Sequence, residues 1–296
     1  MYEKVISTYL DKYFETLDNK KVKEIIKYSV KGGKCIRGFI VKHIIEKLGD
    51  KNNPIRWEPI VAVELIHAAS LIIDDLPCMD NDIIRRNKPS TFIQYGKHEA
   101  ILFSFYIISE SIKLLNIAIH SPESLNIMIS EWCELLGKNL VIGQLMDINS
   151  DATEFFNIKK NNYNDDIIKY KTCSLFSFTF ILGAIFTRKK LDLDEFKQIG
   201  FHFGMMFQLV DDYKDREEDN KDANYILQYG PKKSLQKYKN ERFHLIQLLE
   251  KNDLLTPEFV TIISTLDASF IPDEQSQNHK TTCPYAQSST RCPASQ

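Results

Sequence analysis

Apolar residues recur along most of the chain every three to four positions, a spacing typical of amphipathic α-helices. This periodicity predicts helices over the ranges 3–17, 20–30, 34–48, 55–75, 98–117, 122–149, 164–187, 193–215, 231–250 and 257–267. Three helix starts carry a cap residue followed by proline: Asn53-Pro54, Ser121-Pro122 and Thr256-Pro257. Strand signals are weak, so the pattern predicts an all-α fold.

The pattern also predicts one domain over residues 1–268. No linker divides this range, and a chain of 296 residues with 43% hydrophobic residues can bury one large core. From about Asp273 onwards, large apolar residues become scarce and Ser, Gln, Thr and Pro replace them. We therefore predict a polar, disordered tail over residues 269–296.

Charge and cysteine content exclude several classes of protein. A formal net charge of -2 provides no overall attraction for nucleic acid. The six cysteines show neither CxxC nor Cys/His metal spacing. The chain opens on polar residues, and no apolar run reaches the length of a membrane span. These features predict a cytoplasmic protein with free thiols and no transmembrane segment.

The densest group of charges follows directly on an apolar helical run. Its four aspartates are Asp74, Asp75, Asp80 and Asp82. Pro77 stops the helix between them. Carboxylates this close repel one another unless a cation lies among them, and their hard oxygen atoms favour Mg²⁺. The adjacent Arg85 and Arg86 suit a phosphate group, so the stretch predicts a magnesium–phosphate site.

Two other interpretations of this stretch exist. One is a solvated acidic loop, because runs of charge usually lie on the protein surface. The other is a calcium loop, which needs a Gly at its sixth position and a Glu at its twelfth. Residues 80–82 begin no such pattern.

A second acidic set favours the metal interpretation. Asp211, Asp212 and Asp215 also follow an apolar helical run. Asp211 and Asp215 are four positions apart and therefore share a helix face. Two such sets, each at the end of an apolar helix, predict that the sets face each other across a cavity and share metal ions.

A basic glycine loop precedes both acidic sets. Lys34 and Arg37 lie on the predicted first turn of a helix after Gly32-Gly33, where a helix N-terminus attracts anions. A plain helix-start loop is the alternative. His67 lies about two turns before Asp74 on the same helix face. It is either part of the site or a core histidine with satisfied hydrogen bonds.

These motifs occur in a familiar order. They are G-G-K-x-x-R, then the string D-D-L-P-C-M-D-N-D-x-x-R-R, then G-Q-x-x-D at 143–147, K-T at 171–172 and F-Q-L-x-D-D-x-x-D at 207–215. Over about residues 28–250 the chain resembles the trans-isoprenyl diphosphate synthases. Among them it is most similar to geranylgeranyl diphosphate synthases that carry a two-residue insertion in the first Asp-rich motif.

The resemblance implies an isoprenoid-synthase (terpenoid synthase) fold, a helical bundle around a central apolar cavity, usually as a homodimer. It implies three Mg²⁺ ions held by Asp74, Asp75, Asp80, Asp211, Asp212 and Asp215. It also places Arg85 on the allylic diphosphate. The residues implied for isopentenyl diphosphate are Lys34, Arg37, His67 and Arg86. Those implied near the allylic carbon are Lys171, Thr172, Gln208 and Gln144.

The implied reaction is the head-to-tail condensation of isopentenyl diphosphate with dimethylallyl, geranyl or farnesyl diphosphate. Metal ions neutralise the departing diphosphate, and the resulting allylic cation needs nearby dipoles and the exclusion of water. Ala69 and Ser70, about one turn before Asp74, are small and favour a C20 over a C15 product. Close packing between helices is the other explanation for two small residues.

Other functions remain alternatives: a farnesyl (C15) or longer-chain synthase, a terpene cyclase, or a non-catalytic regulatory subunit. Some positions depart from the family pattern, with Cys35 for Arg, Gly38 for Pro and Asn87 for Gly. The segment after Asp215 is short, and Lys221 is the candidate for its missing phosphate-binding lysine.

Overall fold

The computed structural model describes residues 2–52, 54–148, 163–217 and 224–270. Its elements in chain order are α1 (Tyr2–Glu15), α2 (Lys20–Val30), α3 (Ile36–Leu48), α4 (Glu58–Asp74), β1 (Ile84–Arg85), β2 (Lys88–Pro89), α5 (Thr91–Tyr95), α6 (Lys97–Ala118), α7 (Pro122–Glu131), the π-helix η1 (Trp132–Leu140), α8 (Val141–Ile148), α10 (Tyr163–Ile167), the π-helix η3 (Ile168–Cys173), α11 (Ser174–Phe186), α12 (Leu193–Asp215), α13 (Tyr225–Tyr229), α14 (Pro231–Lys251) and α15 (Pro257–Phe270).

The predicted all-α fold is confirmed, and each predicted helix is present. The range 122–149 forms one run of α7, η1 and α8, and 164–187 contains α10, η3 and α11. The short helices α5 and α13 were not predicted, because five residues are too few to show a helical period. The strands β1 and β2 pair antiparallel in the part of the chain that the structure describes. Their turn holds Arg86 and Asn87 at φ 54° and 59°, the left-handed geometry of a tight hairpin.

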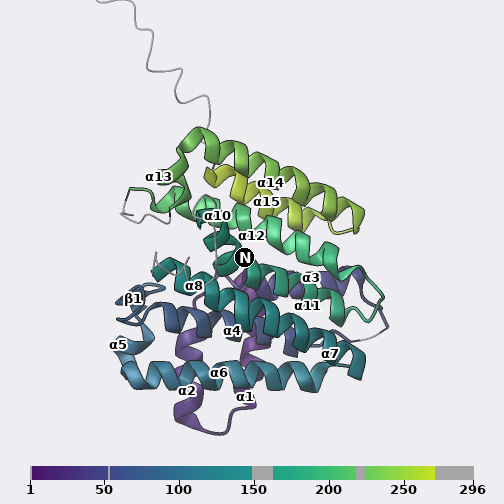
Figure 1. The fold of residues 1–296 in the computed structure, drawn as a ribbon. Coiled ribbons are helices and arrows are strands. Elements are labelled where there is room, and N and C mark those ends of the chain that lie inside the picture. The colour runs from purple at the N-terminus through teal and green to yellow at the C-terminus, as the bar shows by residue number, and fades with distance from the viewer. Residues whose placement is uncertain (1, 53, 149–162, 218–223, 271–296) are drawn as a thin grey trace, which may run out of the picture.

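Helix α11 lies at the centre of the bundle and packs against α3 and α12 (Figure 1). All of its 13 residues are buried. Its sequence has no polar face, and a helix that is apolar all round is stable in water only when other helices surround it. On one side of this centre α4 packs along α6, and on the other α14 packs along α12.

Close approach of helices in this core requires glycine. A Cβ on Gly200 of α12 would overlap the backbone of Ser177 on α11. Nearby, Phe176 and Phe203 fill the same interface with ring centroids 5.0 Å apart. The α11–α12 contact therefore depends on the missing side chain at Gly200.

Helix α6 corrects one sequence expectation. It is the one described helix that is long and apolar enough to cross a membrane by length and composition, whereas no such run was expected. The same test is passed by core helices of soluble proteins, and 33% of the apolar window in α6 is buried inside the structure. The buried part lies on the side that packs on α4.

The C-terminal boundary also differs slightly from the prediction. Helix α15 continues to Phe270, which is buried, two residues into the range predicted as a tail. The other residues of the predicted tail, 271–296, lie outside the described residues.

We predict that Gly200→Ala lowers the free energy of unfolding by about 1–3 kcal/mol, because the added methyl group must push apart two helix backbones. Gly137→Ala in η1 is the matched control. Its Cβ would meet the ring of Trp132 at an ordinary 3.6 Å. Urea unfolding followed by circular dichroism measures both, and equal stabilities would contradict the argument.

Candidate active site

A cavity with a volume of about 830 Å³ opens among α3, α4, η1, α8, η3, α11 and α12. Twelve of the predicted site residues line it: Lys34, Arg37, His67, Ser70, Asp74, Arg85, Arg86, Gln144, Lys171, Thr172, Gln208 and Asp211. The rest of the wall is mostly apolar. The structure therefore brings together in one cavity the motifs that the sequence places far apart.

Asp74 and Asp211 face this cavity from two different helices. Asp74 is the last residue of α4, and Asp211 lies in the final turns of α12. Burial raises the pKa of Asp74 to about 6, and Asp80 adds to the rise while Lys171 opposes it. Burial also raises the pKa of Asp211, and Lys34 opposes that rise. Both carboxylates stand at helix C-termini, where the partial charge is negative, so the site attracts cations.

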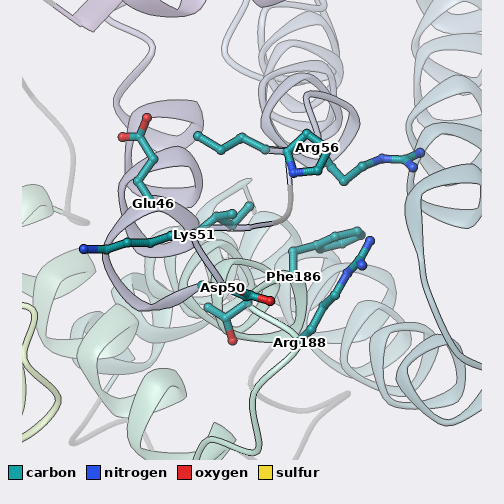
Figure 2. Close-up of a pocket in the computed structure, with 11 residues that line it drawn as sticks. Glu46, Asp50, Lys51, Arg56, Phe186 and Arg188 are labelled. Carbon is teal, nitrogen blue, oxygen red and sulfur yellow. The ribbon is translucent and has the colours of Figure 1, made fainter.

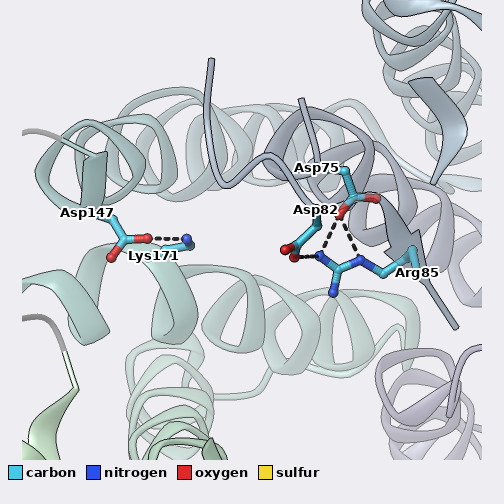
Figure 3. Close-up of polar contacts among 5 residues, drawn as sticks. All are labelled: Asp75, Asp82, Arg85, Asp147 and Lys171. Carbon is cyan, nitrogen blue, oxygen red and sulfur yellow. Dashed lines mark hydrogen bonds and ion pairs between the residues drawn. The ribbon is translucent and has the colours of Figure 1, made fainter. Parts of the chain in front are cut away.

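Asp75 has a different place from the one predicted. It is 2% exposed and does not line the cavity. Arg85 donates to its Oδ1 from Nε at 2.8 Å and from Nη2 at 2.5 Å, and Nη2 also donates to Asp82 Oδ2 at 2.7 Å (Figure 3). Two carboxylates thus hold the guanidinium of Arg85 at the cavity. Asp82, which the sequence placed in the acidic cluster without a role of its own, is one of them.

Lys171 is held by Asp147, the aspartate of the G-Q-x-x-D motif, for which no role was predicted. Its Nζ lies 2.5 Å from Asp147 Oδ2, and Asp147 with Asp74 raises the pKa of the lysine against the effect of burial (Figure 3). A Cβ on Gly143 would overlap the backbone of Lys171. Two residues of the G-Q-x-x-D motif therefore position Lys171. Gly143 allows α8 to pack directly against η3, and Asp147 forms an ion pair with the lysine.

A hydrogen-bonded chain runs from the cavity wall into the core. Thr172 Oγ1 donates to Gln208 Oε1 at 2.6 Å, and Gln208 Nε2 donates to Asp212 Oδ1 at 2.7 Å. The backbone N–H of Tyr225 donates to Asp212 Oδ2 at 2.9 Å. Asp212 is buried and does not line the cavity, so its visible task is to orient Gln208 and anchor the start of α13.

Four other predicted residues lie away from the cavity wall or outside the description. Asp80 lies in the turn after α4 and donates its backbone N–H to the Asp74 carbonyl at 2.9 Å. Asp215 is exposed at the end of α12, one turn after Asp211. Ala69 is fully buried against neighbouring helices, and Ser70 forms the wall at this level instead. Lys221 lies outside the described residues.

Basic side chains gather on the other side of the cavity, beside a carboxylate that the sequence analysis missed. The Arg37 guanidinium lies 4.1 Å from the centroid of the Phe176 ring, and burial lowers its pKa to about 10. Glu64, 4% exposed, accepts the backbone N–H of Gly38 at 2.7 Å. A proline at 38 has no N–H to donate, so this departure from the family pattern creates a contact. The sequence feature that could have identified Glu64 is its place as an acid inside an apolar helix, three residues before His67.

His67 and Arg86 complete this basic side. Burial and the nearby Arg37 and Arg86 lower the pKa of His67 well below its ordinary value, so the imidazole is neutral. Arg86 Nη1 donates to the carbonyls of Ser29 at 3.0 Å and Val30 at 2.6 Å. Arg86 therefore caps the C-terminus of α2 while its side chain borders the cavity.

A second, smaller cavity of about 180 Å³ lies between the end of α3 and the end of α11 (Figure 2). Its charged lining residues are Glu46, Asp50, Lys51, Arg56 and Arg188. None of the predicted site residues lines it. The larger cavity is therefore the candidate active site.

Known proteins share this architecture. A crystal structure of a geranyltranstransferase from Thermotoga maritima superposes with a TM-score of 0.75 at 25% identity, covering 90% of this chain and 98% of the other. An isoprenoid synthase family member from Thermotoga neapolitana superposes with a TM-score of 0.71 at 26% identity, covering 95% of this chain and 100% of the other. The predicted isoprenoid-synthase fold is confirmed.

Sequence comparison agrees. A farnesyl diphosphate synthase of Bacillus subtilis is 32% identical over 223 residues, 73% of each chain. The large subunit 2 of a heterodimeric geranylgeranyl pyrophosphate synthase of Arabidopsis thaliana is 32% identical over 205 residues, 68% of this chain. The chain spans only 54% of the length of that plant relative, and 59% of a second one, geranylgeranyl pyrophosphate synthase 4. Residues 19–227 match the polyprenyl synthetase family, and with both acidic motifs lying inside this range the chain belongs to that family.

Proposed function

We propose that this protein is a Mg²⁺-dependent prenyltransferase that joins isopentenyl diphosphate head-to-tail to allylic diphosphates and makes geranylgeranyl diphosphate. One observation carries the proposal: Asp74 and Asp211, from helices far apart in sequence, line one cavity whose remaining wall is largely apolar. A solvated acidic loop would not bury these groups, and an EF-hand takes its ligands from one loop of twelve consecutive residues.

The residues present fit magnesium. The donors facing the cavity are carboxylate oxygens, and within the described residues no group of three or more His, Cys, Asp or Glu is arranged to hold a metal alone. Mg²⁺ commonly takes one or two carboxylates and completes its shell with water and substrate phosphate. Asp74 and Asp211 would hold it, with Asp80 and Asp215 beside them. When bound, it would act as a Lewis acid that neutralises the departing diphosphate.

The charged side chains divide between two substrates. Arg85, oriented by Asp75 and Asp82, offers its guanidinium to the allylic diphosphate. Lys34 and Arg37, at the start of α3, offer cations and helix N–H groups to isopentenyl diphosphate. Neutral His67 and the capping Arg86 border the same subsite.

The reaction needs no protein nucleophile. The allylic C–O bond breaks, and the electron pair leaves with diphosphate. The dipoles of Thr172, Gln208 and Gln144 lie in the cavity wall where the allylic cation forms, and the apolar wall keeps water away. The double bond of isopentenyl diphosphate then forms the new C–C bond, and a proton is lost to the released diphosphate.

Two observations support a C20 product. Ser70 leaves room one turn below Asp74, and several relatives are named geranylgeranyl pyrophosphate synthases. The alternative product is farnesyl diphosphate, since the Bacillus subtilis relative is named for it. A chromatogram of the product distinguishes the two.

The homodimer is also part of the proposal. One face of α6 exposes apolar side chains in the single chain: Ile101, Leu102, Phe105, Tyr106, Ile112 and Ile117. Large exposed apolar patches usually mark interaction sites, and contact with a second copy of the chain would remove this face from water.

Purified protein supplied with labelled isopentenyl diphosphate, Mg²⁺ and each allylic starter tests the activity. We expect label in a C20 product, no label after chelation, and a rate at least ~100-fold lower for Asp211→Asn, because charge on the leaving group is then poorly neutralised. Glu134→Gln, an exposed carboxylate on η1, is the control. No incorporation by the wild-type protein with any starter would contradict the proposal and favour a regulatory subunit.

The different places of Asp74 and Asp75 predict different kinetics. Asp74→Asn should lower kcat, since this group faces the reacting diphosphate. Asp75→Asn should mainly raise the KM for the allylic diphosphate, by about tenfold, because Arg85 loses its charged hydrogen bonds to Asp75. Steady-state kinetics with varied allylic substrate measure both, and equal losses of kcat would refute the distinction.

The dimer prediction is tested by charge on α6. Phe105 is 63% exposed, and Phe105→Glu should convert the assembly to a monomer of about 34.4 kDa in sedimentation velocity. Phe243, 58% exposed on α14, provides the matched control Phe243→Glu. A monomeric wild type, or a dimer insensitive to the α6 change, would rule out this interface.

A further inference from the structure

One part of the apolar cavity wall is built by a continuous helical run, from Trp132 in η1 to Ile148 in α8. Its lining residues are Trp132, Leu136, Gly137, Leu140, Val141, Gln144, Leu145 and Ile148. Gln144 stands level with the polar end, where Gly143 meets Lys171. Trp132 is the lining residue of this run that lies farthest from Gln144 towards its N-terminus.

The π-helical geometry of η1 sets the place of this tryptophan. In a π-helix, hydrogen bonds join residues five apart, so the residue on the next turn from Trp132 is Gly137. A Cβ on Gly137 would lie 3.6 Å from Cζ3 of the indole. The ring therefore lies over a residue without a side chain, and both residues line the cavity. Insertions that create π-turns are frequent at functional sites.

The N–H group of the Trp132 indole also lacks the hydrogen-bond acceptor that a buried indole usually has. Its Nε1 is buried and has no hydrogen-bond partner in the part of the chain that the structure describes. A buried tryptophan normally finds an acceptor for its N–H, and an unpaired buried donor calls for an explanation. The unpaired N–H of Trp132 lowers stability. We explain its presence by the way in which the indole limits the length of the cavity.

The position of the ring can be compared with the length of an isoprenoid chain. Trp132 is twelve residues from Gln144, which at 1.5 Å per residue is at most roughly 18 Å. Three bonds of an extended chain span about 3.6 Å, so the four bonds of an isoprene unit span about 5 Å. Three units then reach about 14 Å and four reach about 19 Å.

We propose that Trp132 is the side chain that stops chain elongation in this protein, which rests on the prenyltransferase function proposed above. A farnesyl chain of three units fits between the reacting carbon and the indole. A geranylgeranyl chain of four units meets the ring and cannot re-enter as a substrate. Gly137 supports this role, because a Cβ there would already touch the indole at 3.6 Å, so side chains longer than alanine would displace the ring.

The positions before Asp74 do not set this limit. Ala69 is fully buried and does not line the cavity. Ser70 is small and lies only one turn, about 5 Å, from Asp74, so it leaves the cavity open beyond it. The limit therefore lies deeper, on η1.

Product analysis of Trp132→Ala tests the proposal. With farnesyl diphosphate and excess isopentenyl diphosphate, we expect the fraction of C25 and longer products to rise at least ~10-fold, with the geranyl-to-farnesyl step unchanged. Trp132→Phe keeps a ring at the position and should retain the C20 product. Label confined to C20 in active Trp132→Ala would overturn the role of Trp132 and leave the prenyltransferase function standing, whereas an inactive wild type would remove that function.

A second measurement applies even if Trp132→Ala fails to fold. The chain has 2 tryptophans, and Trp57 lies outside the cavity lining at the start of α4. In Trp57→Phe, the fluorescence of the remaining indole should shift on binding farnesyl diphosphate with Mg²⁺, and not on binding dimethylallyl diphosphate. Calorimetry verifies that both diphosphates bind. An emission spectrum that does not change when farnesyl diphosphate binds would overturn the proposal.

Discussion

The mutual repulsion of carboxylates around one half-buried cavity is the constraint on which the site depends. Asp74 and Asp211 each stand near a helix C-terminus, where the backbone adds negative potential, and burial raises the pKa of both. Such groups are stable in their charged form only beside cations. Lys34 and Lys171 provide part of that charge from the protein itself. The remainder is suited to a divalent metal that arrives with its phosphate ligand.

The cations of the site are positioned as carefully as its acids. Arg85 is held by Asp75 and Asp82, and Lys171 by Asp147. A long side chain that is already fixed loses less conformational freedom when a diphosphate binds. Several acids near the site thus orient a base or a glutamine, as Asp212 does for Gln208, and are not exposed to the cavity. The two kinds of aspartate differ by burial and partner, and not by residue type.

One strained backbone position and two glycines also shape the site. Arg86 adopts a left-handed backbone at φ 54°, and its contacts with the carbonyls at the end of α2 offset that strain. Gly143 and Gly200 allow two pairs of helices to touch through their backbones. These contacts set how far apart the motif-bearing helices lie, and with it the width of the cavity.

Much of this protein could be predicted from sequence because its signals are local. The helical period located the long helices, and acids directly after apolar runs marked the ends of α4 and α12 on the cavity. The sequence could not separate Asp74 from Asp75, or Ser70 from Ala69, because neighbours on a helix point about 100° apart and only the packed partner decides which faces the cavity. No role was predicted for Asp147, Glu64 or Trp132 for a similar reason. Their roles come from contacts with residues distant in the chain, which tertiary packing alone creates.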